Sequence, residues 1–158
     1  QAMRELLTPD ALAAADLVNG RNLFRKTCYA CHKLYGEGGE VGPDITGANR
    51  SNLEYLLGNV LTPSAEIQDA YKMTLILTDE GRTYSGIVIG EDQRRLTIRM
   101  ANQEDPVVIP KVNIESREVA AVSMMPEGLL NNLTPQEVLD LMAYLQTSKQ
   151  VADPGSTN

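Results

Sequence analysis

Apolar residues recur with helical spacing near the start of the chain. The stripe over residues 17–24 predicts a helix with one apolar face. Within it, Gly20 leaves a notch beside the ring of Phe24, where a second helix can cross closely. Just upstream, Thr8 and Pro9 have the residue types of a helix N-cap and first turn, which predicts a turn or a short helix there.

Two further helices are predicted from their start signals. Ser51 to Glu54 has the residue types of a capping box and predicts a helix that runs through Leu61 and ends at Thr62–Pro63. The segment 133–138 combines a Thr N-cap, a Pro at the first helical position and a Glu at the third. The helix that follows continues to Leu145, and we expect its apolar stripe to lie across the notch at Gly20.

Between residues 72 and 122 the apolar period changes from helical to alternating. This pattern predicts several short antiparallel strands, arranged as a meander or a small barrel. The segment has no His, no Cys and no glycine-rich phosphate loop, so we expect no catalytic centre in it. Its expected tasks are to cover an edge of a cofactor or to dock a partner. The expected strands are 73–77, 83–89, 95–100 and 107–109, with turns at 79–81 and 91–93.

Composition narrows the function classes. The chain has 158 residues, of which 42% are hydrophobic and 22% charged, as in a soluble globular domain. The formal net charge of −7 disfavours a protein that binds the phosphate backbone, so we expect no nucleic-acid partner. No apolar run approaches the ~18–20 residues needed to span a bilayer, and the N-terminus lacks a signal-peptide pattern. We therefore expect a mature product, a trimmed form or a piece of a longer protein.

The scarcest residue types fall together in one motif. Both cysteines and the one histidine form Cys28-Tyr29-Ala30-Cys31-His32. This spacing is typical of c-type haem attachment, in which two thiols add to the vinyl groups and the histidine binds the iron. Three other uses stay open: a zinc site, which would need a carboxylate ligand; a thioredoxin-like redox pair, which normally follows a buried strand; and a small structural disulfide.

Two residues downstream of the motif are candidates for supporting this site. The segments 36–39 and 42–44 are too rich in glycine for a regular element and predict a loop that folds back under His32. The backbone carbonyl of Pro43 is the candidate acceptor for the ring nitrogen that does not bind iron, although Pro43 can also simply stiffen a turn. Arg50 is placed to bind a haem propionate, with a solvated arginine as the alternative.

The sixth iron ligand cannot be a second histidine, because the chain has only one. It therefore falls to a methionine, to lysine or a weaker donor, or the position stays open. Met124 and Met125 stand in an irregular segment before the last predicted helix, and we favour Met125 because Pro126 holds it extended. Met142 is expected in the helical core.

These elements in this order resemble a class I cytochrome c, and more closely the haem-binding domain found in large proteins of planctomycetes and verrucomicrobia. The resemblance implies an α+β fold in which an all-α class I cytochrome c core is interrupted by a small antiparallel β insertion. It divides the chain into 8–71, the insertion 72–122, the distal-ligand loop and last helix 123–149, and a flexible tail 150–158. The matching segments are 20–24, 28–32, 41–47, 123–130 and 140–145.

The resemblance also implies function. It implies one haem c attached through Cys28 and Cys31, with His32 as the proximal and Met125 as the distal iron ligand. The expected activity is one-electron transfer rather than catalysis, with a redox partner or a fused dehydrogenase, in the periplasm or another extracytoplasmic compartment. Two alternatives stay open: a five-coordinate haem that senses a small ligand or reacts with peroxide, and a β segment that serves as a docking module.

Overall fold

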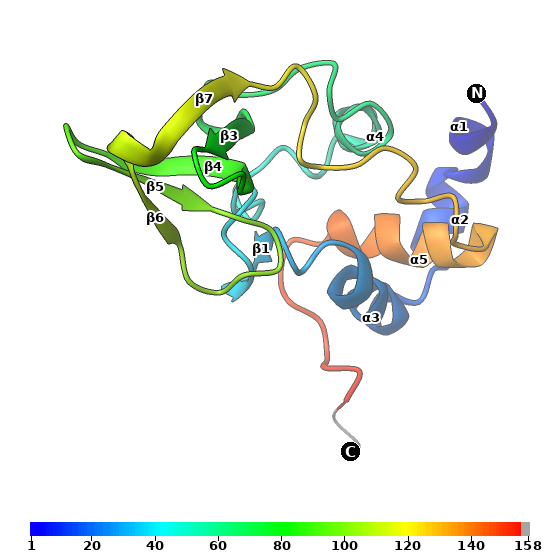
Figure 1. Cartoon of the computed structure of the whole chain (residues 1–158). Coiled ribbons are helices and arrows are strands. Elements are labelled where there is room, and N and C mark those ends of the chain that lie inside the picture. The colour runs from blue at the N-terminus through cyan, green and yellow to red at the C-terminus, as the bar shows by residue number, and fades with distance from the viewer. Residues whose placement is uncertain (156–158) are drawn as a thin grey trace.

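The computed structural model describes residues 1–155 and has two parts with separate cores. One core lies among the helices, and the other lies within an antiparallel sheet. Figure 1 shows the sheet at one end of the molecule and most helices at the other, joined by long loops. No helix in the described residues is long and apolar enough to cross a bilayer.

Two of the three predicted helix starts have the expected capping residue. Thr8 caps a short helix with Pro9 in its first turn, and Thr134 forms a capping box with Glu137. For the middle helix, Asn52 rather than Ser51 is the cap, because its side chain accepts a hydrogen bond from the backbone of Tyr55. The α-helices are α1 (Ala2–Leu6), α2 (Pro9–Ala13), α3 (Leu17–Thr27), α4 (Leu53–Leu61) and α5 (Pro135–Leu145).

Helices α3 and α5 cross at Gly20, as its notch predicts. A Cβ atom at Gly20 would lie only 2.1 Å from the carbonyl oxygen of Asp140. Beside the crossing, the rings of Phe24 and Tyr144 pack with centroids 5.7 Å apart. The buried carboxylate of Asp140 accepts a hydrogen bond of 2.9 Å from the backbone N–H of Asp16, at the start of α3. This crossing is the centre of the helical core.

The sheet has five antiparallel strands in the order β6-β5-β4-β3-β7. Its core residues are Ile76, Leu96, Ile98 and Ile109, all at most 3% exposed. The edge strand β7 was not among the expected strands, because it is exposed at five of its six positions and shows no apolar alternation. The strands are β3 (Thr74–Thr78), β4 (Thr83–Glu91), β5 (Arg95–Arg99), β6 (Val107–Pro110) and β7 (Ile114–Val119), with 3-10 helices η1 (Asp69–Tyr71) and η2 (Lys111–Asn113).

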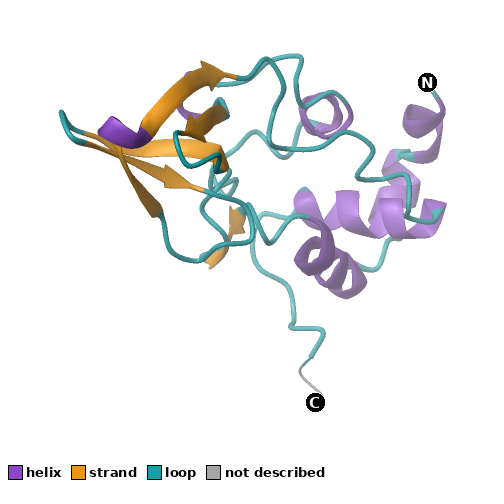
Figure 2. Cartoon of the chain, in the orientation of Figure 1, coloured by secondary structure: helices purple, strands orange, loops and turns teal. Residues whose placement is uncertain are grey.

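The expected architecture, an all-α cytochrome core with a small β insertion, is wrong. The chain is mixed, with 30% of it helical and 21% in strands. Figure 2 shows the strands gathered apart from most of the helices, and the five-stranded sheet has a core of its own. A second, two-stranded ribbon follows the cysteine motif, made of β1 (Lys33–Leu34) and β2 (Glu37–Gly38). The turn between them holds Tyr35 and Gly36 at positive φ, so glycine here permits a tight hairpin where we expected an irregular loop.

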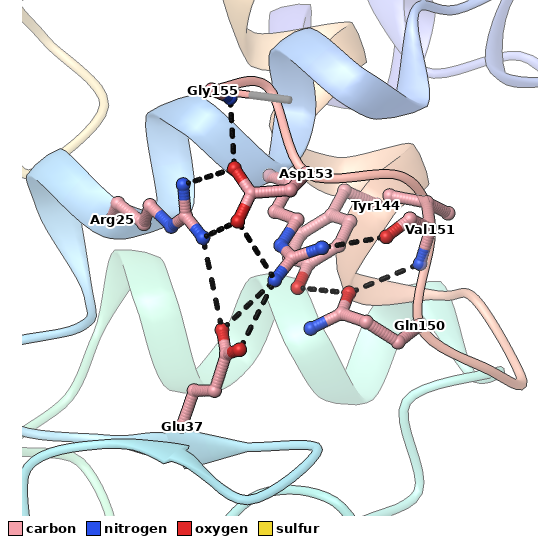
Figure 3. A network of polar contacts seen from close by, with 8 residues as sticks. Arg25, Glu37, Tyr144, Gln150, Val151, Asp153 and Gly155 are labelled. Atoms are coloured by element: carbon pink, nitrogen blue, oxygen red, sulfur yellow. Dashed lines mark hydrogen bonds and ion pairs between the residues drawn. The ribbon is translucent and has the colours of Figure 1, made fainter. Parts of the chain in front are cut away.

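Residues 150–155, the described part of the expected flexible tail 150–158, make several polar contacts. The carboxylate of Asp153 accepts hydrogen bonds of 2.9 and 2.8 Å from the guanidinium of Arg25 (Figure 3). The buried side chain of Arg21 donates to the carbonyl oxygen of Val151 at 2.6 Å and to Glu37 on β2 at 3.0 Å. These contacts tie the end of the chain to α3 and to the β1–β2 ribbon. The last three residues of the expected tail, 156–158, lie outside the described residues.

Candidate functional site

The cysteine motif forms one turn that continues directly from α3. Cys28 is the C-cap of that helix, and its N–H donates to the carbonyl oxygen of Phe24 at 2.8 Å. The N–H groups of Cys31 and His32 both donate to the carbonyl oxygen of Cys28, at 3.2 and 2.9 Å. A rigid helix end therefore carries both thiols and the imidazole on a single short turn.

Neither thiol is set up for thiolate chemistry. Cys28 and Cys31 are free rather than joined in a disulfide. Burial, followed by the nearby Cys31, raises the pKa of the Cys28 thiol to about 12, and burial also raises the pKa of Cys31. No three His, Cys, Asp or Glu side chains in the described residues are grouped to share a metal ion. The turn thus offers two neutral thiols and one imidazole, which suits thiol addition better than a zinc site or a reactive redox pair.

The imidazole of His32 is oriented by the glycine-rich segment that follows it. Its Nδ1 lies 2.9 Å from the carbonyl oxygen of Pro43, which can only accept, so Nδ1 carries the proton. Gly42 lies against the ring, and a Cβ there would come within 2.8 Å of the ring carbon Cε1. The Nε2 atom has no hydrogen-bond partner within the part of the chain that the structure describes. In the neutral imidazole this contact leaves the lone pair on Nε2, which is the nitrogen that can bind a metal.

Arg50 has a different environment from either one we expected. Its side chain is 7% exposed, and four of its five N–H groups donate to backbone carbonyls. These carbonyls belong to Ile45 and Thr46 in the loop before α4, and to Leu145 and Thr147 at the end of α5, at distances of 2.6 to 3.1 Å. Arg50 thus joins the loop to the helix C-terminus, and one Nη2 hydrogen has no hydrogen-bond partner among the described residues.

Met124 and Met125 lie half-buried in the segment between β7 and α5, outside any helix or strand. The N–H of Met125 donates to Ser123 Oγ at 3.1 Å, and the N–H of Ser123 donates to Ser64 Oγ at 3.0 Å. Sequence reasoning missed both serines. A hydrogen bond between residues 59 positions apart leaves no spacing pattern in the sequence.

The comparisons with known proteins agree with this chemistry. The family model for cytochrome c matches residues 17–149, from the start of α3 to just beyond α5. No curated protein matches the chain. Cytochrome c domains hold haem c covalently, generally pass electrons to partner proteins and are commonly found outside the cytoplasm. The family model covers most of the chain, and the turn at Cys28, Cys31 and His32 fits haem c. The chain therefore belongs to the cytochrome c family of electron-transfer domains.

Proposed function

We propose that the chain is a single-haem electron carrier in which His32 and Met125 would bind the iron. Cys28 and Cys31 would hold the haem covalently. The observation that carries the proposal is the orientation of His32, which follows directly after two free thiols. Its Nδ1 donates to the carbonyl oxygen of Pro43, and its Nε2 has no hydrogen-bond partner among the described residues. That is the arrangement an axial imidazole ligand requires.

The bound haem supplies a one-electron couple, and the protein tunes and insulates it. The Pro43 carbonyl fixes the plane of the His32 ring and makes it a stronger electron donor. A thioether opposite an imidazole favours the reduced iron and raises the reduction potential. α3 and the close approach of Gly42 would hold the His32 ring in place, which would favour a small reorganisation on electron transfer.

We assign the distal position to Met125 rather than Met124. Pro126 restricts the backbone of Met125 to extended conformations, and Ser123 holds its N–H. Met124 has no hydrogen bond from its backbone N–H within the described part of the chain, so its position is less constrained.

The test is the visible and near-infrared spectrum of the holoprotein, oxidised and reduced, with carbon monoxide added to the reduced form. We expect a low-spin spectrum, a weak sulfur-to-ferric charge-transfer band and no response to carbon monoxide. Met125→Ala should abolish the band, and the matched control Met124→Ala should keep it. A high-spin spectrum with rapid carbon monoxide binding in the unaltered protein would overturn the proposal and favour a small-ligand site.

We also propose that the electron partner is a dehydrogenase-type protein or fused domain outside the cytoplasm. This rests on the resemblance to the planctomycete and verrucomicrobial haem-binding domain. The net charge of −7 supports a partner with a basic contact surface. The rate of electron exchange with a basic redox protein should then fall as salt is added, whereas a rate independent of salt would contradict the basic surface.

A further inference from the structure

The segment that carries Met125 is attached to the rest of the protein mainly through one residue. It begins after Ala120, which follows β7 and whose N–H donates to the carbonyl oxygen of Met73 at 2.8 Å. It re-enters the helical core at the buried Leu130. Over residues 121–127, the hydrogen bonds that the described structure shows all pass through Ser123. Ser123 is therefore the point at which this segment is held.

The partner of Ser123 lies on a rigid part of the fold. Ser64 follows the buried Pro63 in a turn closed by the N–H of Ala65, which donates to the carbonyl oxygen of Thr62 at 3.0 Å. Proline at the second position fixes the backbone of this turn. The hydroxyl of Thr62 also donates to the carbonyl oxygen of Gly58 at 2.8 Å, which joins the turn to α4. The Ser64 hydroxyl thus extends from the end of a helix whose position is fixed.

We propose that Ser64 and Ser123 are positioning residues for the Met125 thioether. The Ser64 hydroxyl accepts from the backbone of Ser123, and the Ser123 hydroxyl accepts from the backbone of Met125, so two hydrogen bonds in series connect the end of α4 to the distal ligand. Losing either hydroxyl frees a backbone N–H and loosens the segment without touching the thioether. This inference rests on the proposed His32 and Met125 ligation.

The experiment measures how fast cyanide binds to the ferric holoprotein, a step that requires Met125 to leave the iron. Ser64→Ala and Ser123→Ala should each bind cyanide about five times faster, the ratio that corresponds to one net hydrogen bond. Ser64→Thr keeps a hydroxyl and should retain the original rate. The matched control is Ser116→Ala on β7, an exposed serine with no side-chain hydrogen bond in the described residues, and it should also leave the rate unchanged.

A second control separates local loosening from a general loss of stability. Ile109→Val removes one methyl group from the sheet core and should cost about as much stability as one hydrogen bond. Rates for both serine variants equal to that of Ser116→Ala would overturn the inference, as would equal acceleration by Ile109→Val. Failure of the proposed function looks different: the unaltered protein would lack the sulfur-to-ferric band, or Met125→Ala would keep it.

Discussion

Replacing Gly20 by alanine should force α3 and α5 apart. The new Cβ would lie 2.1 Å from the carbonyl oxygen of Asp140 and 2.6 Å from the Cβ of Tyr144. Ordinary contact begins at 3.4 Å, so the closer approach is more than 1 Å too short. Both atoms belong to the backbone or are bonded directly to it, so no rotation of a side chain relieves the overlap. The helices themselves must move.

The size of the effect follows from two opposing contributions. Overpacking a tight interior typically costs about 1–3 kcal/mol, and a clash against backbone belongs near the top of that range. Alanine returns about 1 kcal/mol through its higher helix propensity. Separating the helices also stretches the 2.9 Å hydrogen bond from the N–H of Asp16 to the carboxylate of Asp140, and it widens the contact between the rings of Phe24 and Tyr144. We expect a net loss of about 2 kcal/mol in the free energy of unfolding.

Urea unfolding followed by circular dichroism measures this loss, with Gly58→Ala in α4 as the matched control. A Cβ at Gly58 meets nothing within 4 Å, so the same substitution should stabilise the protein by about 0.5–1 kcal/mol. The two variants therefore differ in sign although the chemical change is identical. A Gly20→Ala protein as stable as the unaltered one would refute the close crossing.

Two further predictions concern charged side chains. Hydrogen bonds from Arg117 and Lys111 lower the pKa of Glu91 to about 2, so its stabilising effect is complete above its ordinary value of 4.5 and disappears as the pH falls toward 2. The difference in urea midpoint between the unaltered protein and Glu91→Gln should accordingly close over that range, and a difference independent of pH would contradict the ion pairs. Arg50→Lys should lower the free energy of unfolding by about 2–3 kcal/mol, because an ammonium cannot reach the carbonyls that the guanidinium fork spans. An unchanged thermal midpoint would show that those bonds are dispensable.

The features that could be predicted from sequence are those whose causes lie within a few residues. The capping box at Thr134 depends on Glu137, three positions away, and it forms as expected. The turn from Cys28 to His32 closes on its own backbone. The close crossing at Gly20 was also predictable, because a missing side chain on an apolar helix face indicates a nearby helix without specifying which atoms it contacts.

The features that were missed depend on partners far along the chain. Arg50 bonds to carbonyls 95 and 97 positions away, and no local pattern distinguishes it from a surface arginine. Ser64 and Ser123 are separated in the chain by all five strands of the sheet. The edge strand β7 is held by pairing with β3 rather than by an apolar face, so its sequence lacks the alternation that identified the other strands.

The position of the sheet in the chain explains how it can coexist with a cytochrome c site. Its first and last strands are neighbours, with Thr74 paired to Val119, so the chain leaves and returns at adjacent points. A segment whose ends lie together adds a second core without straining the helices on either side. The sheet also contacts the site, because Arg99 on β5 lies 3.4 Å from Glu40, three residues before Pro43. Beyond the last strand, the chain continues to Ser123, whose N–H donates to Ser64 Oγ and whose Oγ accepts from the N–H of Met125. The sheet therefore borders both the loop that orients His32 and the segment that carries the proposed ligand Met125, so a change in the sheet can alter either one.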